Sequence, residues 1–282
     1  MQKFELFDET FDPFRTESYE LSIQGYLNGF SFCVKDLTRN LFIALVNKDF
    51  DKPVVFADDW MDRVDWFLNL YEWIKKPFKK VVLCYESPKF TLVPQEYFIP
   101  EKAKQILTLS HIIDDLEEIR HHNIGKEISC IFSIPSSLTA NLLKTFPNLS
   151  VVSAGSTPLS FHLLKNSIKH TPQLTIAFYN RFAAVNLSHG DKLLHSGTVK
   201  LINSEDTVYH LVNICKQFDI SPAETEITQL SNFANQEDFS TLLKRFFKSL
   251  KLEDSIKHSH FSYQLSQYKT EYINLFNLSL CE

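Results

Sequence analysis

The chain has 282 residues, a length that corresponds to about two domains of roughly 150 residues, although one large domain also occurs at this length. Hydrophobic residues make up 44% and charged residues 22% of the chain, so a sizeable core is expected and a fully disordered chain is excluded. The formal net charge of −5 argues against broad nucleic-acid binding.

Three strand-like runs open the chain and are joined by short links, so they are predicted to form an antiparallel meander. The first link, Gly25 to Gly29, has glycine at both ends, as a hairpin turn favours. A helix is predicted from Asp58 to Lys76, because acidic residues fill its first turns and Pro77 follows its basic end. The three predicted strands span residues 21–24, 30–35 and 41–47.

The predicted helix at 58–76 carries all three tryptophans of the chain on a wide apolar arc. One interpretation is a helix that packs on a sheet. The alternative is that the extra aromatic flank contacts a partner protein or a second subunit. The tryptophans are Trp60, Trp66 and Trp73.

The rest of the first half is predicted to alternate strands and helices. A polar helix is expected from His111 to His122, where Asp114, Glu118 and His122 would lie about one turn apart. Such a carboxylate and histidine face suits a metal ion, but a solvated helix shows the same pattern. The other predicted elements are strands at 81–86, 90–93, 128–134 and 149–153, and helices at 100–109, 137–145 and 157–166.

The second half repeats the opening, with three strand-like runs followed by alternating helices and strands. The order β-β-β-α-β-α therefore occurs twice, starting near Leu21 and near Leu174, and predicts two units with mixed sheets flanked by helices. The predicted elements are strands at 174–179, 182–188, 192–201 and 226–230, and helices at 205–218, 237–250 and 263–280.

The five cysteines show neither C-x-x-C pairs nor the spacing of zinc ligands, so buried reduced thiols in a cytoplasmic protein are expected. Residues 1–16 are acidic and aromatic, which is unlike a secretory signal. Since no run of 18 apolar residues occurs, no membrane span is expected. The basic and aromatic run Lys244–Lys248 separates into different helix faces, which favours amphipathic packing over nucleic-acid binding.

Two tandem β-β-β-α-β-α units resemble the actin-like ATPase fold, whose core is related to that of ribonuclease H. The run Ile131–Pro135, with the helix and strand after it and Thr157-Pro158-Leu159 opening the next helix, is similar to one stretch of that fold. Ser22–Val34 resembles its first phosphate hairpin, Ile176–Val185 its second, and Ile227–Ser231 the strand before its adenosine loop. The resemblance implies a duplicated fold with lobes at residues 1–170 and 171–282.

The stretch Glu86–Pro94 resembles more closely an uncharacterised Bacteroidetes family, a domain of unknown function assigned to this same fold. That resemblance covers about residues 19–280. Because one fold serves many functions, it implies the architecture and leaves the activity open.

Three parts of the nucleotide site depart from the ATPase pattern. Actin-like ATPases hold Mg-ATP with acids and glycines at both hairpins and with glycines in the adenosine loop. In this chain the nearest carboxylate before the first hairpin turn is Glu20, and the second turn has bulky Phe178 and Tyr179 where an acid and glycine are expected. The adenosine loop reads Leu230-Ser231-Asn232-Phe233, without glycine.

These departures predict a non-catalytic cytoplasmic actin-fold protein that acts as a scaffold or regulator through a protein partner. No catalytic, cofactor-binding or metal-binding residue and no cofactor is assigned from the sequence. A homo-oligomer is compatible with the sequence. The alternative function is a nucleotide or metabolite sensor, or a weak ATPase, that uses the cleft between the lobes; a small-molecule kinase would need a catalytic base that the sequence does not place.

Overall fold

The computed structural model describes residues 4–56, 58–166, 169–231, 236–253 and 259–281. The chain forms two compact units. The first comprises Met1–Ser153, Ile256–Tyr268 and Cys281–Glu282, and the second comprises Ala154–Ser255 and Lys269–Leu280. The assignment of the lobes to residues 1–170 and 171–282 stays a prediction.

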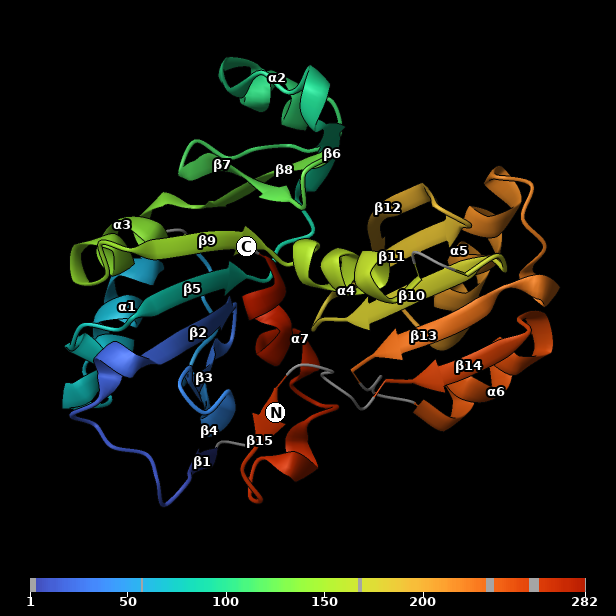
Figure 1. The fold of residues 1–282 in the computed structure, drawn as a ribbon. Coiled ribbons are helices and arrows are strands. Elements are labelled where there is room, and N and C mark those ends of the chain that lie inside the picture. Colours follow the sequence, from blue (N-terminus) through green and yellow to red (C-terminus); the bar gives the residue numbers. More distant parts are fainter. Residues whose placement is uncertain (1–3, 57, 167–168, 232–235, 254–258, 282) are drawn as a thin grey trace. The chain divides into compact units, whose positions relative to one another are not determined.

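The first unit is built on a seven-stranded mixed sheet in which the predicted meander lies at the centre (Figure 1). The meander strands pair antiparallel with one another, whereas β2 pairs in parallel with β5, and β5 in parallel with β9. Two short strands from the ends of the chain cover the outer edge of β4. The strand order is β1 (Phe4–Phe7), β4 (Leu41–Asp49), β3 (Gly29–Asp36), β2 (Tyr19–Tyr26), β5 (Lys80–Tyr85), β9 (Leu149–Ser153), with β15 (His260–Phe261) on β4.

The predicted helix at 58–76 is only partly correct, because α1 (Asp59–Leu68) ends at Asn69. The side-chain amide of Asn69 donates to the Asp65 carbonyl oxygen at 2.8 Å and occupies an acceptor at the end of the helix. Tyr71 is extended, and a separate 3₁₀ turn, η2 (Glu72–Lys75), follows. The predicted helix at 137–145 is confirmed as α3 (Ser136–Thr145), which packs against α1.

The tryptophans pack mostly within the first unit. Trp60 is buried against Phe30 and Tyr85. Trp73 is half-buried and contacts Phe7 and Phe11 of the N-terminal segment, so the chain itself covers much of the aromatic flank. Trp66, at 38% exposure, is the most open of the three.

A small three-stranded sheet is inserted between β5 and α3, and its third strand was missed by the sequence analysis. The predicted helix at 111–122 is wrong, because Glu117–Ile124 forms strand β7, which pairs antiparallel with β8. Gly125, with φ of 62°, allows the tight turn between these two strands. The insert contains β6 (Phe90–Pro94), η3 (Gln95–Tyr97), η4 (Pro100–Lys102), α2 (Ala103–Thr108), β7 and β8 (Ile128–Pro135).

The second unit has a five-stranded sheet with the same connectivity as the core of the first. Its strand order, β12-β11-β10-β13-β14, repeats the order β4-β3-β2-β5-β9 position by position. The predicted internal duplication with mixed sheets is therefore confirmed. The strands are β10 (Gln173–Phe178), β11 (Phe182–His189), β12 (Lys192–Lys200), β13 (Glu226–Leu230) and β14 (Ser249–Leu252).

Helices lie on both faces of the second sheet (Figure 1). Leu174 and Ile176 point into an apolar core shared with α5 and α6, while Thr175 points to the opposite face, where α4 packs. The predicted helix at 237–250 is too long, since Leu250 lies in β14 and packs on the core from there. The helices are α4 (Ser156–Asn166), α5 (Ser204–Gln217) and α6 (Gln236–Phe246).

The predicted helix at 263–280 is not continuous, because the tail forms three short helical segments. Each is too short to present one long apolar face. Short 3₁₀ turns also occur between other elements of both units. The pieces of the tail are η6 (Ser266–Tyr268), α7 (Ile273–Phe276) and η7 (Asn277–Cys281), and the remaining turns are η1 (Thr16–Ser18) and η5 (Pro222–Glu224).

His162 ties α4 to the sheet from a fully buried position. Its Nδ1 lies 2.7 Å from Thr175 Oγ1 in β10, and its Nε2 lies 2.9 Å from Ser188 Oγ in β11. Burial lowers the pKa of His162 from 6.5 to about 4, so the ring is neutral at pH 7. Protonation of His162 in the folded protein is unfavourable, because the buried imidazolium would not be solvated by water.

The pKa of His162 predicts acid destabilisation. Between pH 6.5 and pH 4 the unfolded chain binds the proton more readily than the folded chain, so the free energy of unfolding falls as the pH falls through this window. The expected loss from this group between pH 7.5 and pH 5 is about 2 kcal/mol. Urea titrations should show a smaller loss over that range for His162→Gln, which is also less stable at pH 7.5. An equal loss in both proteins would contradict this role.

Gly29 predicts a second stability difference. A Cβ at this position would lie 2.2 Å from the Lys48 carbonyl oxygen, so Gly29→Ala forces the neighbouring strand to move and should cost about 3 kcal/mol. Gly125→Ala is the matched control, because its Cβ meets no atom within 4 Å and only the left-handed backbone is strained, at about 1 kcal/mol. Urea unfolding of the two variants should separate these costs; equal costs would contradict the close approach at Gly29.

Candidate functional site

The first hairpin turn, between β2 and β3, lies far from the carboxylate that the sequence placed nearest to it. Glu20 is at the start of β2, about 20 Å of strand away from the turn at Tyr26. Its carboxylate is buried and lies 3.3 Å from Lys80 Nζ on the neighbouring strand. Glu20 therefore forms an ion pair within the sheet and does not contribute a carboxylate to the hairpin turn.

Two other carboxylates lie near this hairpin, and the sequence analysis did not single them out. Asp49 Oδ1 is 3.0 Å from the Tyr26 hydroxyl, and Glu86 Oε1 accepts a hydrogen bond of 2.6 Å from Gln24 Nε2. Burial raises the pKa of Tyr26, and the charge of Asp49 raises it further. Asp49 ends β4, and Glu86 follows β5. The two acids are distant in sequence, and only the pairing of β2 with β5 and of β3 with β4 brings both of them near the end of β2.

The second hairpin turn, between β10 and β11, is filled by its own aromatic side chains. Phe178 and Tyr179 are 6% and 7% exposed, so both are buried rather than presented to a ligand. Phe178 packs edge-on against Phe239 of α6, with ring centroids 5.2 Å apart, and Tyr179 stacks on Phe182 at 4.8 Å. The Tyr179 hydroxyl donates to the Ala154 carbonyl oxygen at 2.5 Å.

The backbone of the same turn is bound by the loop that follows β13. The Phe178 N–H donates to Ser231 Oγ at 3.2 Å, and the Ser231 hydroxyl lies 3.1 Å from the Phe178 carbonyl oxygen. That oxygen also accepts from Asn274 Nδ2 at 3.3 Å. Ser231 holds the left-handed conformation, with φ of 64°, which costs a non-glycine residue about 1 kcal/mol. The Phe178 N–H is therefore already hydrogen-bonded within the protein.

The residues considered as a metal face do not come together. Asp114 lies before β7 and is 3.4 Å from Lys89 Nζ, whereas Glu118 pairs with Arg120 at 2.6 Å. His122 packs edge-on against Phe132 of β8. Among the described residues, no three His, Cys, Asp or Glu side chains are grouped closely enough to hold a metal ion.

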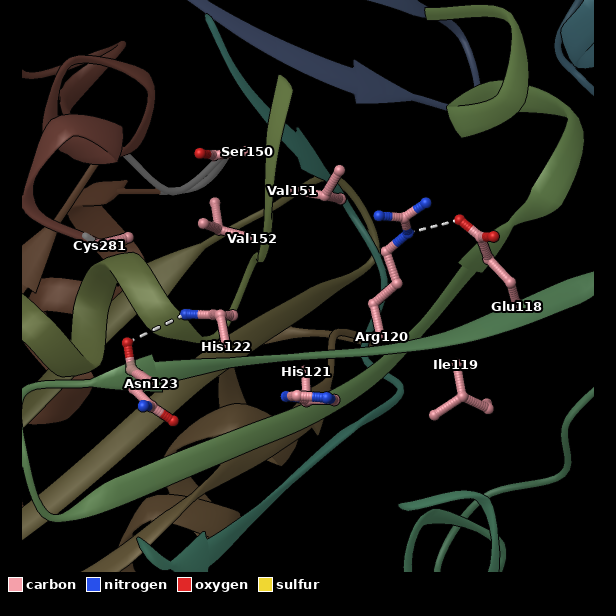
Figure 2. Close-up of a pocket in the computed structure, with 10 residues that line it drawn as sticks. All are labelled: Glu118, Ile119, Arg120, His121, His122, Asn123, Ser150, Val151, Val152 and Cys281. Carbon is pink, nitrogen blue, oxygen red and sulfur yellow. Dashed lines mark hydrogen bonds and ion pairs between the residues drawn. The ribbon is translucent and has the colours of Figure 1, made fainter. Parts of the chain in front are cut away.

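A pocket of about 640 Å³ lies between the small sheet and the large sheet of the first unit (Figure 2). One wall is β7 and the other is β9, the last strand of the large sheet, with Cys281 contributing from η7. A second pocket, of about 400 Å³, opens beside it and shares His121, His122 and Asn123. The larger pocket is lined by Glu118–Asn123, Ser150–Val152 and Cys281.

His122 lies where the two walls of the larger pocket approach each other. Its Nδ1 is 3.3 Å from the Asn123 carbonyl oxygen (Figure 2). The Ser153 N–H of β9 points at its Nε2 at 3.5 Å. Burial lowers the pKa of His122 from 6.5 to about 4, so Nε2 can accept at neutral pH. This contact shows that the Ser153 N–H points toward β7.

Residues 8–250 match a family described as "Protein of unknown function (DUF3822)". The chain belongs to this family. No curated protein matches its sequence.

Solved structures agree on the architecture of this DUF3822 protein. The chain is similar, at 18% identity and a TM-score of 0.82, to a Bacteroides thetaiotaomicron protein with an actin-like ATPase fold and unknown function, covering 97% of this chain and 100% of that one. It is also similar to a chain of the PilM–PilN type IV pilus biogenesis complex, at 11% identity and a TM-score of 0.58, covering 93% and 98%. The predicted actin-like ATPase fold is confirmed.

None of the helices in the described ranges combines the length and apolar character that a bilayer crossing needs. In the described part of the chain, the five cysteines of this DUF3822 protein form no disulfide, and all five are buried. They are Cys33, Cys84, Cys130, Cys215 and Cys281.

The filled hairpin predicts a stability cost at Tyr179. Tyr179→Phe leaves the buried Ala154 carbonyl oxygen without its hydroxyl donor and should lower the free energy of unfolding by about 1–2 kcal/mol. Tyr263→Phe is the matched control, since Tyr263 is 94% exposed and its change should be close to zero. Urea unfolding measures both, and an unchanged Tyr179→Phe protein would argue against the Tyr179–Ala154 bond.

Proposed function

We propose that this DUF3822 protein is a non-catalytic actin-fold protein that acts as a scaffold or regulator by binding a protein partner in the cytoplasm. The observation that carries the proposal is the second hairpin. Its turn holds buried Phe178 and Tyr179 in place of an acid and a glycine, and its backbone is bound by Ser231. For a phosphate to use the Phe178 amide, that bond would have to break first.

The charge around the second turn supports the same proposal. Phosphoryl transfer depends on positioned cations and on metal ligands close to the phosphates. Arg181 is the one charged side chain of the turn between β10 and β11, and it supplies no carboxylate for magnesium. The acids near the first hairpin, Asp49 and Glu86, are hydrogen-bonded to Tyr26 and Gln24 of their own sheet.

Partner binding agrees with how a protein of the same fold is used. The structure at TM-score 0.58 is a chain of a PilM–PilN complex, in which a protein of this architecture is assembled with another protein. The cytoplasmic location is proposed because all five cysteines are buried thiols, as is usual where disulfides are kept reduced.

Calorimetric titration with Mg-ATP, combined with a phosphate-release assay, tests the proposal. The expected result is no heat of binding at micromolar ligand and no phosphate above the rate without protein. A thermal-shift screen of nucleotides and sugars tests the alternative of a ligand sensor, because a ligand at 100 times its Kd stabilises a protein by about 2.7 kcal/mol. Micromolar binding with turnover would overturn the proposal, and a selective shift without turnover would favour the sensor.

A further inference from the structure

The edge of β7 faces the larger pocket with its backbone. Six consecutive residues of β7 line this pocket, although alternate side chains of a strand point to opposite faces. Only the edge of a strand presents consecutive residues in this way. Figure 2 shows β7 crossing the pocket with side chains on both of its sides.

The hydrogen bonds of β8 identify which groups of β7 point outward. The Ser133 N–H donates to the Lys89 carbonyl oxygen on the β6 side, so the backbone of Ser133 faces away from β7. Ser133 is opposite Ile119, which makes this a pair without ladder hydrogen bonds between β7 and β8. Because backbone direction alternates along a strand, the N–H and C=O groups of Ile119 and His121 point out of the small sheet.

The opposite wall presents a second outward-facing backbone. Since the Ser153 N–H points to His122, the backbone of Val151, two residues earlier, points the same way. β9 is the last strand of its sheet on this side, and β7 is the last strand of the small sheet. Outward-facing groups of a terminal strand are a template for pairing with another extended chain.

Arg120 supplies a charge inside the pocket. Its Nε donates to Glu118 Oε1 at 2.6 Å, and Glu118 Oε1 also accepts from the Thr139 hydroxyl. The side chain of Arg120 is 30% exposed, and within the described ranges no group accepts from its two Nη atoms. A guanidinium fork with both Nη atoms available matches a carboxylate in a bidentate geometry.

We propose that the pocket between β7 and β9 binds an extended segment of a partner protein, which pairs with the outer edge of β7 and places an Asp or Glu side chain against Arg120. This inference rests on the proposed partner-binding function and names its site. Main-chain hydrogen bonds to Ile119 and His121 would give affinity, and the carboxylate would give selectivity. Pairing extends the small sheet from three strands to four.

The test uses two phage libraries of ten-residue peptides on the full chain, one with a central Glu and one with a central Gln. Binders are expected from the Glu library. A selected peptide, synthesised with blocked ends, should bind at least about tenfold more weakly after its Glu is changed to Gln or after Arg120→Gln, and the two changes together should add little. Arg181→Gln, an exposed arginine of the second unit, is the control and should leave the Kd unchanged.

A proline substitution tests the strand pairing itself. His121→Pro removes an outward N–H without removing a ladder bond to β8, so the protein should fold, as its circular-dichroism melting can verify, but bind the peptide at least about tenfold more weakly. His121→Ala should bind normally. If His121→Pro does not fold, N-methylation of the peptide amides replaces it: one alternating set should abolish binding and the other should not.

Three results would overturn the inference: no peptide is selected, binding is unchanged by Arg120→Gln, or binding survives methylation of each of the two alternating sets of amides. Binding of the selected peptide at another surface of this chain would also overturn the inference. None of these results bears on catalysis, whereas turnover of Mg-ATP would defeat the proposed function whatever the peptides do. The two failures are therefore separable.

Discussion

Parallel pairing of the first strand of each meander with the strand after the helix is the constraint on which this molecule depends. In the first unit β2 pairs with β5 from Glu20–Lys80 to Gly25–Tyr85, and in the second β10 pairs with β13 from Gln173–Glu226 to Ala177–Leu230. Parallel strands end at the same edge of a sheet, so each hairpin turn lies next to the loop that follows its parallel neighbour. This adjacency is what brings Glu86 to Gln24 in one unit and Ser231 to Phe178 in the other.

The two units keep the same strand order but use this adjacency differently. In the first, small Gly25 and Gly29 remain at the turn, and the tight approach of Gly29 to Lys48 excludes any larger side chain. In the second, the rings of Phe178 and Tyr179 are buried at the turn, and the Ser231 hydroxyl lies within hydrogen-bond distance of the Phe178 N–H and carbonyl oxygen. The sheet pairing needs apolar strands and tight turns, whereas phosphoryl transfer needs acids at particular turn positions, so the proposed loss of that chemistry would leave the architecture intact.

The sequence predicted the duplicated architecture well, because strands buried on both faces form continuous apolar runs that periodicity detects. It failed for β7, a half-buried strand at the end of a small sheet, where Ile119 is one of few apolar residues and the i, i+4 spacing of Glu118 and His122 imitates a helix. Leu250 continued the helical spacing of Phe246 although it lies in β14. The pocket between β7 and β9 was out of reach for the same reason: its walls are distant in sequence, and once β7 is read as a helix no strand edge remains to be found. The bulky aromatic side chains at the second turn, by contrast, could be predicted directly from the sequence, because Phe178 and Tyr179 are consecutive residues of that turn.

The most direct measurement is hydrogen exchange at the Phe178 amide, resolved by NMR with and without Mg-ATP. If Ser231 holds this amide, its exchange is slow in the free protein, becomes faster in Ser231→Ala, and does not change when Mg-ATP is added. An amide that exchanges as fast as an open loop in the free protein, or that becomes protected only when Mg-ATP is present, would contradict the account, because the hairpin would then be available to a phosphate.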